Sequence, residues 1–423
     1  MIGRRDLLVR TGRLLGGAAL VAVSAADPAA RSGAAQAFDD WEAVRAQFDL
    51  SADLAHLGGL YLASHPAPVR EAIERHRRAL DADPVGYLQE HGARLELGVL
   101  RAAAAYLGVD VGDIALTDST TMGLGLLYGG LSIRSDQEIV TTSHDFFATH
   151  EPLRTLAART GAGLKEVELY RAPQDARADA IVASISRALT DRTRIVAVTW
   201  VHSGTGVKLP IGRIAEAVGQ ANRGRDPSDL ALLCVDGAHG LGVEDATVAE
   251  LGCDFLVASG HKWLCGPRGT GLVWGHPAAW PAATATIPSF SDRRRPGGAF
   301  TPGGFHSFEH RWALREAFEF HSAIGKGRVQ GRVHELARQL KEGLAATARV
   351  GLHTPMAEEL SAGIVCFDVE GLAPPAVVRG LRQRGVVATV TPYARQHARL
   401  AAGVFNRPEE VEAALGAIRE LAG

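Results

Sequence analysis

Three apolar runs in the middle of the chain constrain its fold most strongly. They cover Arg194–Trp200, Leu230–Asp236 and Asp254–Ser259, and each is a nearly continuous series of hydrophobic residues. Such runs are typical of strands that are covered on both faces, as in parallel sheets. Helical periodicity alternates with strand patterns after about Pro66. The sequence therefore predicts an α/β fold in which helices cover a mainly parallel sheet.

Weaker patterns predict the remaining elements. Further strands are expected at Ile114–Thr117, Glu138–His144, Ala362–Asp368 and Gly385–Val390. The stretch 281–310 is rich in Pro, Gly and Arg, so we expect an irregular crossover between domains that also carries site residues.

The length of 423 residues and the hydrophobic content of 46% suit a large enzyme of two tightly associated domains. We expect a large domain at 66–300 and a smaller C-terminal α/β domain at 301–423, with residues 38–65 packing on the small domain. The last helix is expected to have Asn406 at its N-cap, Pro408 in its first turn and Glu409 at position N3.

Charge and cysteine content exclude several functions. A net charge of −2 gives no electrostatic case for binding nucleic acid. The basic cluster Arg293–Arg295 suits either a solvated loop or a contact with an acidic substrate. The cysteines form no CxxC pair, so we expect buried free thiols and neither a metal site nor a disulfide framework. They are Cys234, Cys253, Cys265 and Cys366.

Residues 1–37 resemble a twin-arginine export signal. They combine Arg4-Arg5, a weakly apolar stretch at 14–26 and the cleavage-like sequence Ala35-Gln36-Ala37. An ordinary secretory signal or an unstructured tail is the alternative. The apolar stretch is too short to span a bilayer comfortably, so no membrane span is expected after signal removal. We expect a periplasmic or otherwise exported protein that crosses the membrane already folded around its cofactor.

Polar residues follow two of the apolar runs. Lys262 comes shortly after Asp254–Ser259, and open α/β sheets bind ligands at the carboxyl ends of their strands. A desolvated lysine there can lose its proton and attack a carbonyl group, whereas most lysines are simply solvated. Asp236 closes the preceding run, where a carboxylate can hold the ring N–H of a cofactor or cap the next turn.

Two further strand ends carry polar side chains. Ser119-Thr120-Thr121 precedes a helical pattern, and such a helix start can bind a phosphate or can be an ordinary N-cap. His144 follows the strand pattern at 138–142 and can lie flat on an aromatic cofactor, although a lone histidine is more often structural.

Taken in order, Ser119-Thr120-Thr121, His144, Asp236–His239 and Ser259–Lys262 resemble the class V aminotransferase family of pyridoxal-phosphate enzymes, which have fold type I. The resemblance covers essentially the whole mature chain. It implies a mainly parallel, seven-stranded sheet in the large domain, a smaller C-terminal α/β domain, and pyridoxal 5′-phosphate as cofactor.

The resemblance also implies a role for each matching residue. Lys262 would be the Schiff-base lysine, Asp236 the partner of the pyridine nitrogen, His239 the contact of the phenolic oxygen, and His144 the residue stacked on the ring. The expected phosphate ligands are Ser119, Thr120, Thr121, Ser259 and His261.

Other implied roles involve the C-terminal half of the chain. Arg399 matches the arginine that binds the substrate carboxylate, a task suited to a bidentate guanidinium, although a surface salt bridge is the alternative. Thr301, Gly303 and Gly304 fall where the family offers phosphate contacts across a homodimer interface. Many relatives carry asparagine where this chain has Ser203, which can still donate one hydrogen bond to the cofactor.

The sequence constrains the type of reaction less than it constrains the identity of the cofactor. The desulfurase branch needs a cysteine on the loop before Arg399, and Thr391–His397 contains none. Transamination, epimerisation, decarboxylation and elimination stay open, with Lys262 as general base. The export signal, Lys208–Pro210 and Thr301–Trp312 are similar to periplasmic enzymes that tailor pyoverdine siderophores, which implies a glutamyl group of a peptide precursor as substrate. An isopenicillin N epimerase-like enzyme, a C–S lyase and a non-catalytic exported binding protein are the alternatives.

Overall fold

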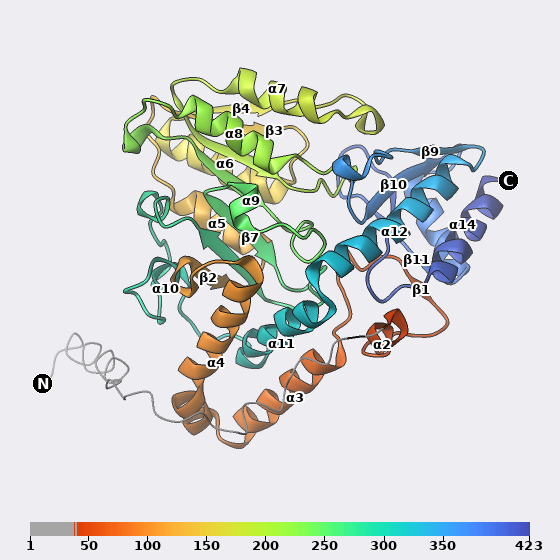
Figure 1. Ribbon diagram of the computed structural model, residues 1–423, viewed down its shortest axis with the longest axis horizontal. Coiled ribbons are helices and arrows are strands. Elements are labelled where there is room, and N and C mark those ends of the chain that lie inside the picture. Colours follow the sequence, from red (N-terminus) through yellow and green to blue (C-terminus); the bar gives the residue numbers. More distant parts are fainter. Residues whose placement is uncertain (1–37, 39) are drawn as a thin grey trace, which may run out of the picture. The chain divides into compact units, whose positions relative to one another are not determined.

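The computed structural model describes residue 38 and residues 40–423, so the expected export signal at 1–37 lies outside the described residues. The described residues belong to one compact unit, and the domain boundaries inside it stay predictions. Their strands form a seven-stranded, a four-stranded and a two-stranded sheet (Figure 1). Among these residues, no helix is both long and apolar enough to cross a membrane.

The large sheet has the strand order β2-β8-β7-β6-β5-β3-β4. Its pairs are parallel except for those of β8, which runs antiparallel to both of its neighbours. The predicted mainly parallel, seven-stranded sheet is therefore confirmed. The strands are β2 (Ile114–Thr117), β3 (Glu138–Thr142), β4 (Gly163–Val167), β5 (Thr193–Thr199), β6 (Leu232–Asp236), β7 (Phe255–Ser259) and β8 (Gly271–Gly275).

The continuous apolar runs arise because helices cover both faces of this sheet. In β5, Ile195 and Ala197 join one core cluster, whereas Val196 and Val198 join the other. The first cluster includes residues of α5 (Thr120–Gly130), α6 (Phe147–Thr160) and α10 (Pro296–Phe300). The second includes residues of α4 (Pro84–Leu107), α7 (Ala178–Ala188), α8 (Ile211–Ala221), α9 (Val248–Leu251) and α11 (Phe308–Ile324). Each apolar residue of β5 is buried whichever way it points.

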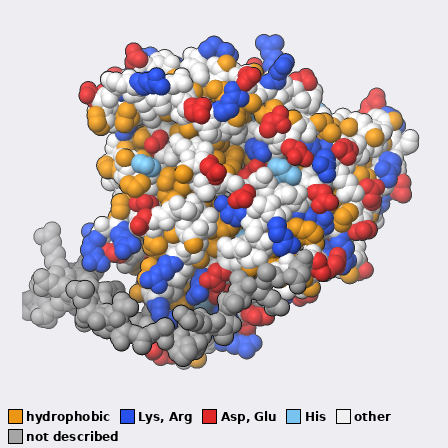
Figure 2. All heavy atoms as spheres, in the orientation of Figure 1, with side chains coloured by type: hydrophobic (Ala, Val, Ile, Leu, Met, Phe, Trp, Pro, Cys, Tyr) orange, Lys and Arg blue, Asp and Glu red, His pale blue; other side chains and the backbone are white. Residues whose placement is uncertain are grey.

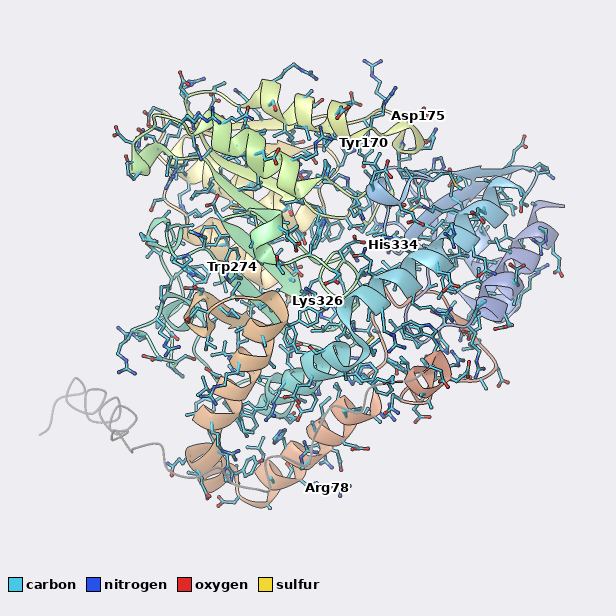
Figure 3. All side chains as sticks on the ribbon, in the orientation of Figure 1. Arg78, Tyr170, Asp175, Trp274, Lys326 and His334 are labelled. Atoms are coloured by element: carbon cyan, nitrogen blue, oxygen red, sulfur yellow. The ribbon has the colours of Figure 1, made fainter. Side chains whose placement is uncertain are left out.

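The four-stranded sheet has the order β12-β13-β10-β9. Its strands are β9 (Val350–Leu352), β10 (Ile364–Val369), β12 (Thr389–Val390) and β13 (Ala398–Ala401). Three helices contribute to its core: α12 (Lys326–Ala345), α13 (Pro374–Gln383) and α14 (Pro408–Ala422). Helix α12 runs from α11 to this sheet, and its His334 Nε2 lies 2.7 Å from Glu244 Oε1, beyond the end of β6 (Figures 1 and 3).

The chain before the large sheet contacts both parts of the fold. It contains α2 (Trp41–Arg45), β1 (Ala55–His56) and α3 (Ala67–Ala82). Strand β1 pairs in parallel with β11 (Val386–Val387), and Leu57 lies in the core of the small sheet. Helices α3 and α4 pack on α11.

Three sequence predictions were wrong in detail. Gly385–Val390 forms two strands, because β11 pairs with β1 whereas β12 pairs with β13. The stretch 281–310 contains the short helix α10. The last helix has Arg407 at its N-cap and Glu410 at N3, since the Arg407 N–H donates to the Glu410 carboxylate at 2.8 Å. The Asn406 side chain instead accepts from the Gly403 N–H.

Charged side chains of both signs are interspersed on the face shown in Figure 2. Ion pairs join many of the charged side chains of the described residues, for example Arg154 with Glu151 and Glu166. This face therefore lacks a continuous row of basic side chains of the kind that binds the phosphate backbone of a nucleic acid.

Candidate active site

Lys262 lies just beyond the carboxyl end of β7, next to the end of β6. Its Nζ is 3.3 Å from His239 Nε2, and His239 Nδ1 accepts a hydrogen bond from the Trp263 indole N–H at 3.2 Å. Burial holds the pKa of His239 well below its usual value, so the ring is neutral. With Nδ1 accepting, the ring proton sits on Nε2 and points at the lysine. That arrangement suits a neutral Lys262 amine, whose lone pair accepts the proton.

The surroundings of Lys262 also favour the neutral amine. Burial lowers its pKa to about 8, against the opposing charge of Asp236, and the Arg399 guanidinium lowers it further. Burial raises the pKa of the Asp236 carboxyl to about 6, although the Ala238 N–H donates to it at 2.9 Å. Asp236 is therefore ionised at neutral pH, while a useful fraction of Lys262 is uncharged and nucleophilic.

We expect Lys262 in cofactor-free protein to react with amine reagents around pH 8. Only the neutral amine reacts, so its labelling rate should rise with pH to a plateau with a midpoint near 8. A solvated lysine would titrate near about 10.4. Reductive methylation at several pH values, followed by peptide mass spectrometry, measures this midpoint. Lys165, a partly exposed lysine labelled in the same sample, is the internal control, and equal midpoints for the two lysines would contradict the assignment.

Hydrogen bonds hold the His144 ring at its edge, and a stacked aromatic ring covers one of its faces. Its Nε2 accepts from the backbone N–H groups of Leu169 and Tyr170 at 3.1 and 3.4 Å. The Tyr170 ring stacks on it, with ring centroids 3.8 Å apart and planes 12° apart. Burial and His202 lower the pKa of His144 to about 3, so the ring is neutral. One face is thus covered by Tyr170, which leaves the opposite face for a second flat group.

Sequence reasoning missed the residues that support His144. Tyr170 Oη lies 2.8 Å from His202 Nδ1 and 2.9 Å from Thr205 Oγ1. Asp145 is buried and accepts hydrogen bonds from Thr142 N–H at 2.8 Å and from Thr199 N–H at 2.7 Å. Asp145 therefore ties the ends of β3 and β5 together. The position of Asp145 directly after the expected His144 was the only signal in the sequence.

The start of α5 lies beside the end of β7, as the sequence predicted for an anion site. Ser119 is the N-cap and accepts from the Met122 N–H at 3.1 Å. Ser259 Oγ accepts from the Thr120 N–H at 2.9 Å and lies 2.5 Å from Thr120 Oγ1. Ser119 is therefore an N-cap, and the hydroxyl groups of Thr120 and Ser259 gather at the positive end of the helix, where phosphate binding stays a prediction.

Two donors near this helix start lack a partner among the described residues. No hydrogen bond of the Thr121 N–H is found there, and the buried His261 Nδ1 also has none. A buried polar atom without a partner, such as His261 Nδ1, is costly unless a ligand or water completes it, whereas the exposed Thr121 can also donate to solvent. The donors and hydroxyls of Thr120, Thr121, Ser259 and His261 fit a phosphate group.

Arg399 on β13 is buried without a carboxylate partner among the described residues. Its Nε donates to Thr389 Oγ1 at 3.0 Å, and one terminal nitrogen donates to the Ser203 carbonyl at 2.7 Å. Ser203 Oγ in turn lies 2.8 Å from Tyr393 Oη. A buried guanidinium with spare donors is a binding site for a carboxylate. The sequence predicted no role for Tyr393, whose hydroxyl contacts the Ser203 hydroxyl.

Thr301 and Gly303 lie apart from these residues. The Thr301 hydroxyl donates to the Gly297 carbonyl and accepts from the Leu116 N–H, which fastens α10 to β2. The Gly303 N–H donates to the Pro288 carbonyl. Within the described chain, these hydrogen bonds of Thr301 and Gly303 involve neither Lys262 nor the start of α5. Their expected phosphate contacts would have to be made to a second copy.

One family model and several known proteins match this chain. The family model for class V aminotransferases matches residues 101–392, more than half of the chain. Isopenicillin N epimerase from Streptomyces clavuligerus is 26% identical over 406 residues, which cover 91% of this chain and 99% of that protein. A cysteine desulfurase from Pectobacterium carotovorum is 27% identical and covers 78% of this chain and 82% of its own.

Solved structures show the same fold. A mutant of the protein C-DES, with glycine covalently linked to its PLP cofactor, superposes with a TM-score of 0.81 at 21% identity. It covers 89% of this chain and 99% of its own. Apo cysteine desulfurase from Thermococcus onnurineus has a TM-score of 0.77 at 22% identity, covering 90% of this chain and 98% of its own.

Proposed function

Since this chain belongs to the class V aminotransferase family of pyridoxal-phosphate enzymes, we propose that it removes the Cα proton from an amino-acid group, by transamination or a related reaction. The proposal rests above all on one observation, the buried Lys262 amine with its lowered pKa between Asp236 and His239. Transamination, epimerisation and elimination across a C–S bond all begin with loss of this proton, so the proposal covers the common step.

The residues of the site fit pyridoxal phosphate. Thr120, Thr121, Ser259 and His261 would hold the phosphate, Asp236 the ring nitrogen, and His144 the ring face opposite Tyr170. His239 and Ser203 would lie by the phenolic oxygen. When bound, the cofactor supplies an electron sink for the charge left on Cα. Lys262 would attach the cofactor and, once released, carry the Cα proton, while Arg399 would orient the substrate by its carboxylate.

Replacing Arg399 by glutamine is expected to raise KM for the amino-acid substrate by about 100-fold, with a smaller effect on kcat. A buried charge-assisted pair is worth roughly 2–5 kcal/mol when one partner is removed. Steady-state kinetics on the active substrate measures the change. The matched control is Arg395→Gln, an exposed arginine of the same hairpin, which should behave as wild type. An unchanged KM in Arg399→Gln would show that Arg399 does not bind the substrate.

We propose a peptide-linked amino acid, such as a glutamyl group of a siderophore precursor, as substrate. The supporting observations are the sequence similarities at Lys208–Pro210 and Thr301–Trp312 and an apolar rim near the site. Phe147 is 58% exposed beside Phe146, whose ring lies 5.6 Å from that of Tyr393. The test is to incubate the enzyme with extracts of a deletion strain and with free amino acids. Turnover of free amino acids alone would reject the peptide substrate.

Epimerisation is the second candidate, favoured by the alignment with isopenicillin N epimerase over nearly its full length. Chiral analysis separates the two reactions, because epimerisation inverts Cα and keeps the amino group whereas transamination removes it.

A C–S lyase would release a sulfur product. Desulfuration through a protein thiol is disfavoured, since the described cysteines are all buried and burial raises the pKa of Cys366 to about 12. A non-catalytic binding protein would release no product at all.

We further propose export through the twin-arginine signal. Changing Arg4 and Arg5 to lysine should leave active, folded protein in the cytoplasm, because this pathway recognises the arginine pair. Cell fractionation with an activity assay measures the distribution. Unaltered export of the double variant would point to an ordinary secretory signal instead.

A homodimer is also proposed, with the segment 287–305 at the interface. Phe290 and Phe305 are 70% and 84% exposed, and large apolar side chains exposed to that degree favour burial against a partner. Gly303 lies between them, so a second copy could bring this segment to the phosphate site of its neighbour.

A further inference from the structure

Three side chains outside the site converge on one point of the small sheet. His353 Nε2 lies 2.7 Å from Asp368 Oδ2, and His397 Nδ1 lies 2.9 and 3.0 Å from the two oxygens of Asp368. Their nearest ligand-type atoms all lie within 4.8 Å of one another. His353 directly follows β9, Asp368 lies on β10 and His397 directly precedes β13, so the three residues lie on or next to three adjacent strands.

We propose that His353, Asp368 and His397 bind a divalent transition-metal cation, with Zn²⁺ as the first choice. Two imidazoles and one carboxylate form a donor set that suits Zn²⁺ and leaves the remaining position for water. A tetrahedral ion about 2.1 Å from each donor atom would separate neighbouring donors by about 3.4 Å. The contacts of Asp368 with the two histidines would therefore lengthen by roughly half an ångström to admit the ion.

The charge balance of the cluster favours a cation over a simple hydrogen-bonded network. Among the described residues Asp368 has no lysine or arginine partner, and its ion-pair contacts are the two histidines. The centroids of the two imidazole rings are only 3.9 Å apart, which brings two possible nitrogen ligands to one carboxylate.

The position of the cluster suggests what the ion would do. In the β10–β13 pairing, Cys366 lies opposite Arg399, and continuing that register places Asp368 opposite His397 on the same face. His397 also closes the loop 391–397, since its N–H donates to Thr391 Oγ1 at 2.8 Å and its carbonyl accepts from the Thr391 N–H. That loop carries Tyr393. The ion would therefore fix the hairpin that positions Tyr393 and Arg399.

Calorimetric titration of chelator-treated holoenzyme with Zn²⁺, combined with metal analysis, tests the proposal. We expect one equivalent to bind, and we expect His353→Gln and Asp368→Asn each to weaken binding by about 100-fold or more, since even indirect metal partners contribute 10–100-fold. The matched control His276→Gln removes an exposed histidine outside the cluster and should bind as wild type.

A second readout separates specific from adventitious binding. Zn²⁺ should raise the thermal midpoint of the wild-type protein and of His276→Gln but not that of His353→Gln. His353 is half-buried near the surface, so its variant should fold even where Asp368→Asn does not. Absence of binding to the wild type, or equal binding by the wild type and His353→Gln, would overturn the proposal.

Discussion

Replacing Lys262 by alanine is expected to slow Cα hydrogen exchange in the amino-acid substrate by at least about 10³-fold. A positioned general base contributes roughly 10²–10⁴-fold, and this variant also loses the residue that attaches the cofactor. The pKa of about 8 suits Lys262 to this task, because the amine can be neutral near physiological pH. Exchange of the Cα hydrogen in D₂O, followed by proton NMR, measures the rate without knowledge of the final product.

Two controls separate loss of chemistry from loss of folding. Lys165→Ala removes a lysine from the edge strand β4, where it pairs with Glu138, and should keep the wild-type rate. Added ethylamine should partly restore exchange to Lys262→Ala, because a small amine can occupy the space of the side chain and accept the proton. If Lys262→Ala exchanged the Cα hydrogen at the wild-type rate without added amine, Lys262 would not be the general base.

Replacing Asp236 by asparagine should give two opposite effects. The rate should fall about 10²–10³-fold, as when a preorganised electrostatic partner is removed, because an amide cannot neutralise a protonated ring nitrogen. The cofactor-free protein should become more stable. Since burial raises the pKa of Asp236 from 3.8 to about 6, its ionisation destabilises the empty fold as pH rises through that window. The shift corresponds to at most about 3 kcal/mol.

Activity and denaturant unfolding of the same preparations measure both effects. The asparagine carbonyl can keep the hydrogen bond from the Ala238 N–H, so a gross local rearrangement is not expected. The gain in stability should appear above pH 6, shrink as the pH falls through the window between the two pKa values, and vanish below about pH 3, where the aspartate is protonated in both states. A fall in both activity and stability at neutral pH would show that Asp236 serves the fold rather than the chemistry.

The parts of the site that lie at strand ends could be predicted from the sequence. Buried parallel strands such as β6 and β7 read as continuous apolar runs, and their carboxyl ends share one edge of the sheet, so Asp236 and Lys262 had to lie close together. The helix start at Ser119 was recognisable for the same reason, because a capping residue directly follows an apolar strand.

The parts built from loops could not be predicted. Tyr170 comes three residues after β4, whose sequence shows no apolar run, and Tyr393 comes three residues after β12. Both tyrosines reach His144 and Ser203 through contacts that only the folded chain creates. The cluster of His353, Asp368 and His397 has sequence separations of 15 and 29 residues, which match no metal motif. The split of Gly385–Val390 depends on β1, a strand of two residues more than 300 positions earlier. Local patterns carry no signal of such partners.

The most direct test of the central claim is to treat the purified protein with borohydride and map its peptides by mass spectrometry. Borohydride converts the lysine–cofactor linkage into a stable bond. The proposed site predicts a yellow protein that bleaches on reduction and a pyridoxyl phosphate group on the peptide containing Lys262. A cofactor group on any other lysine, or none after incubation with pyridoxal phosphate, would contradict the assignment of Lys262.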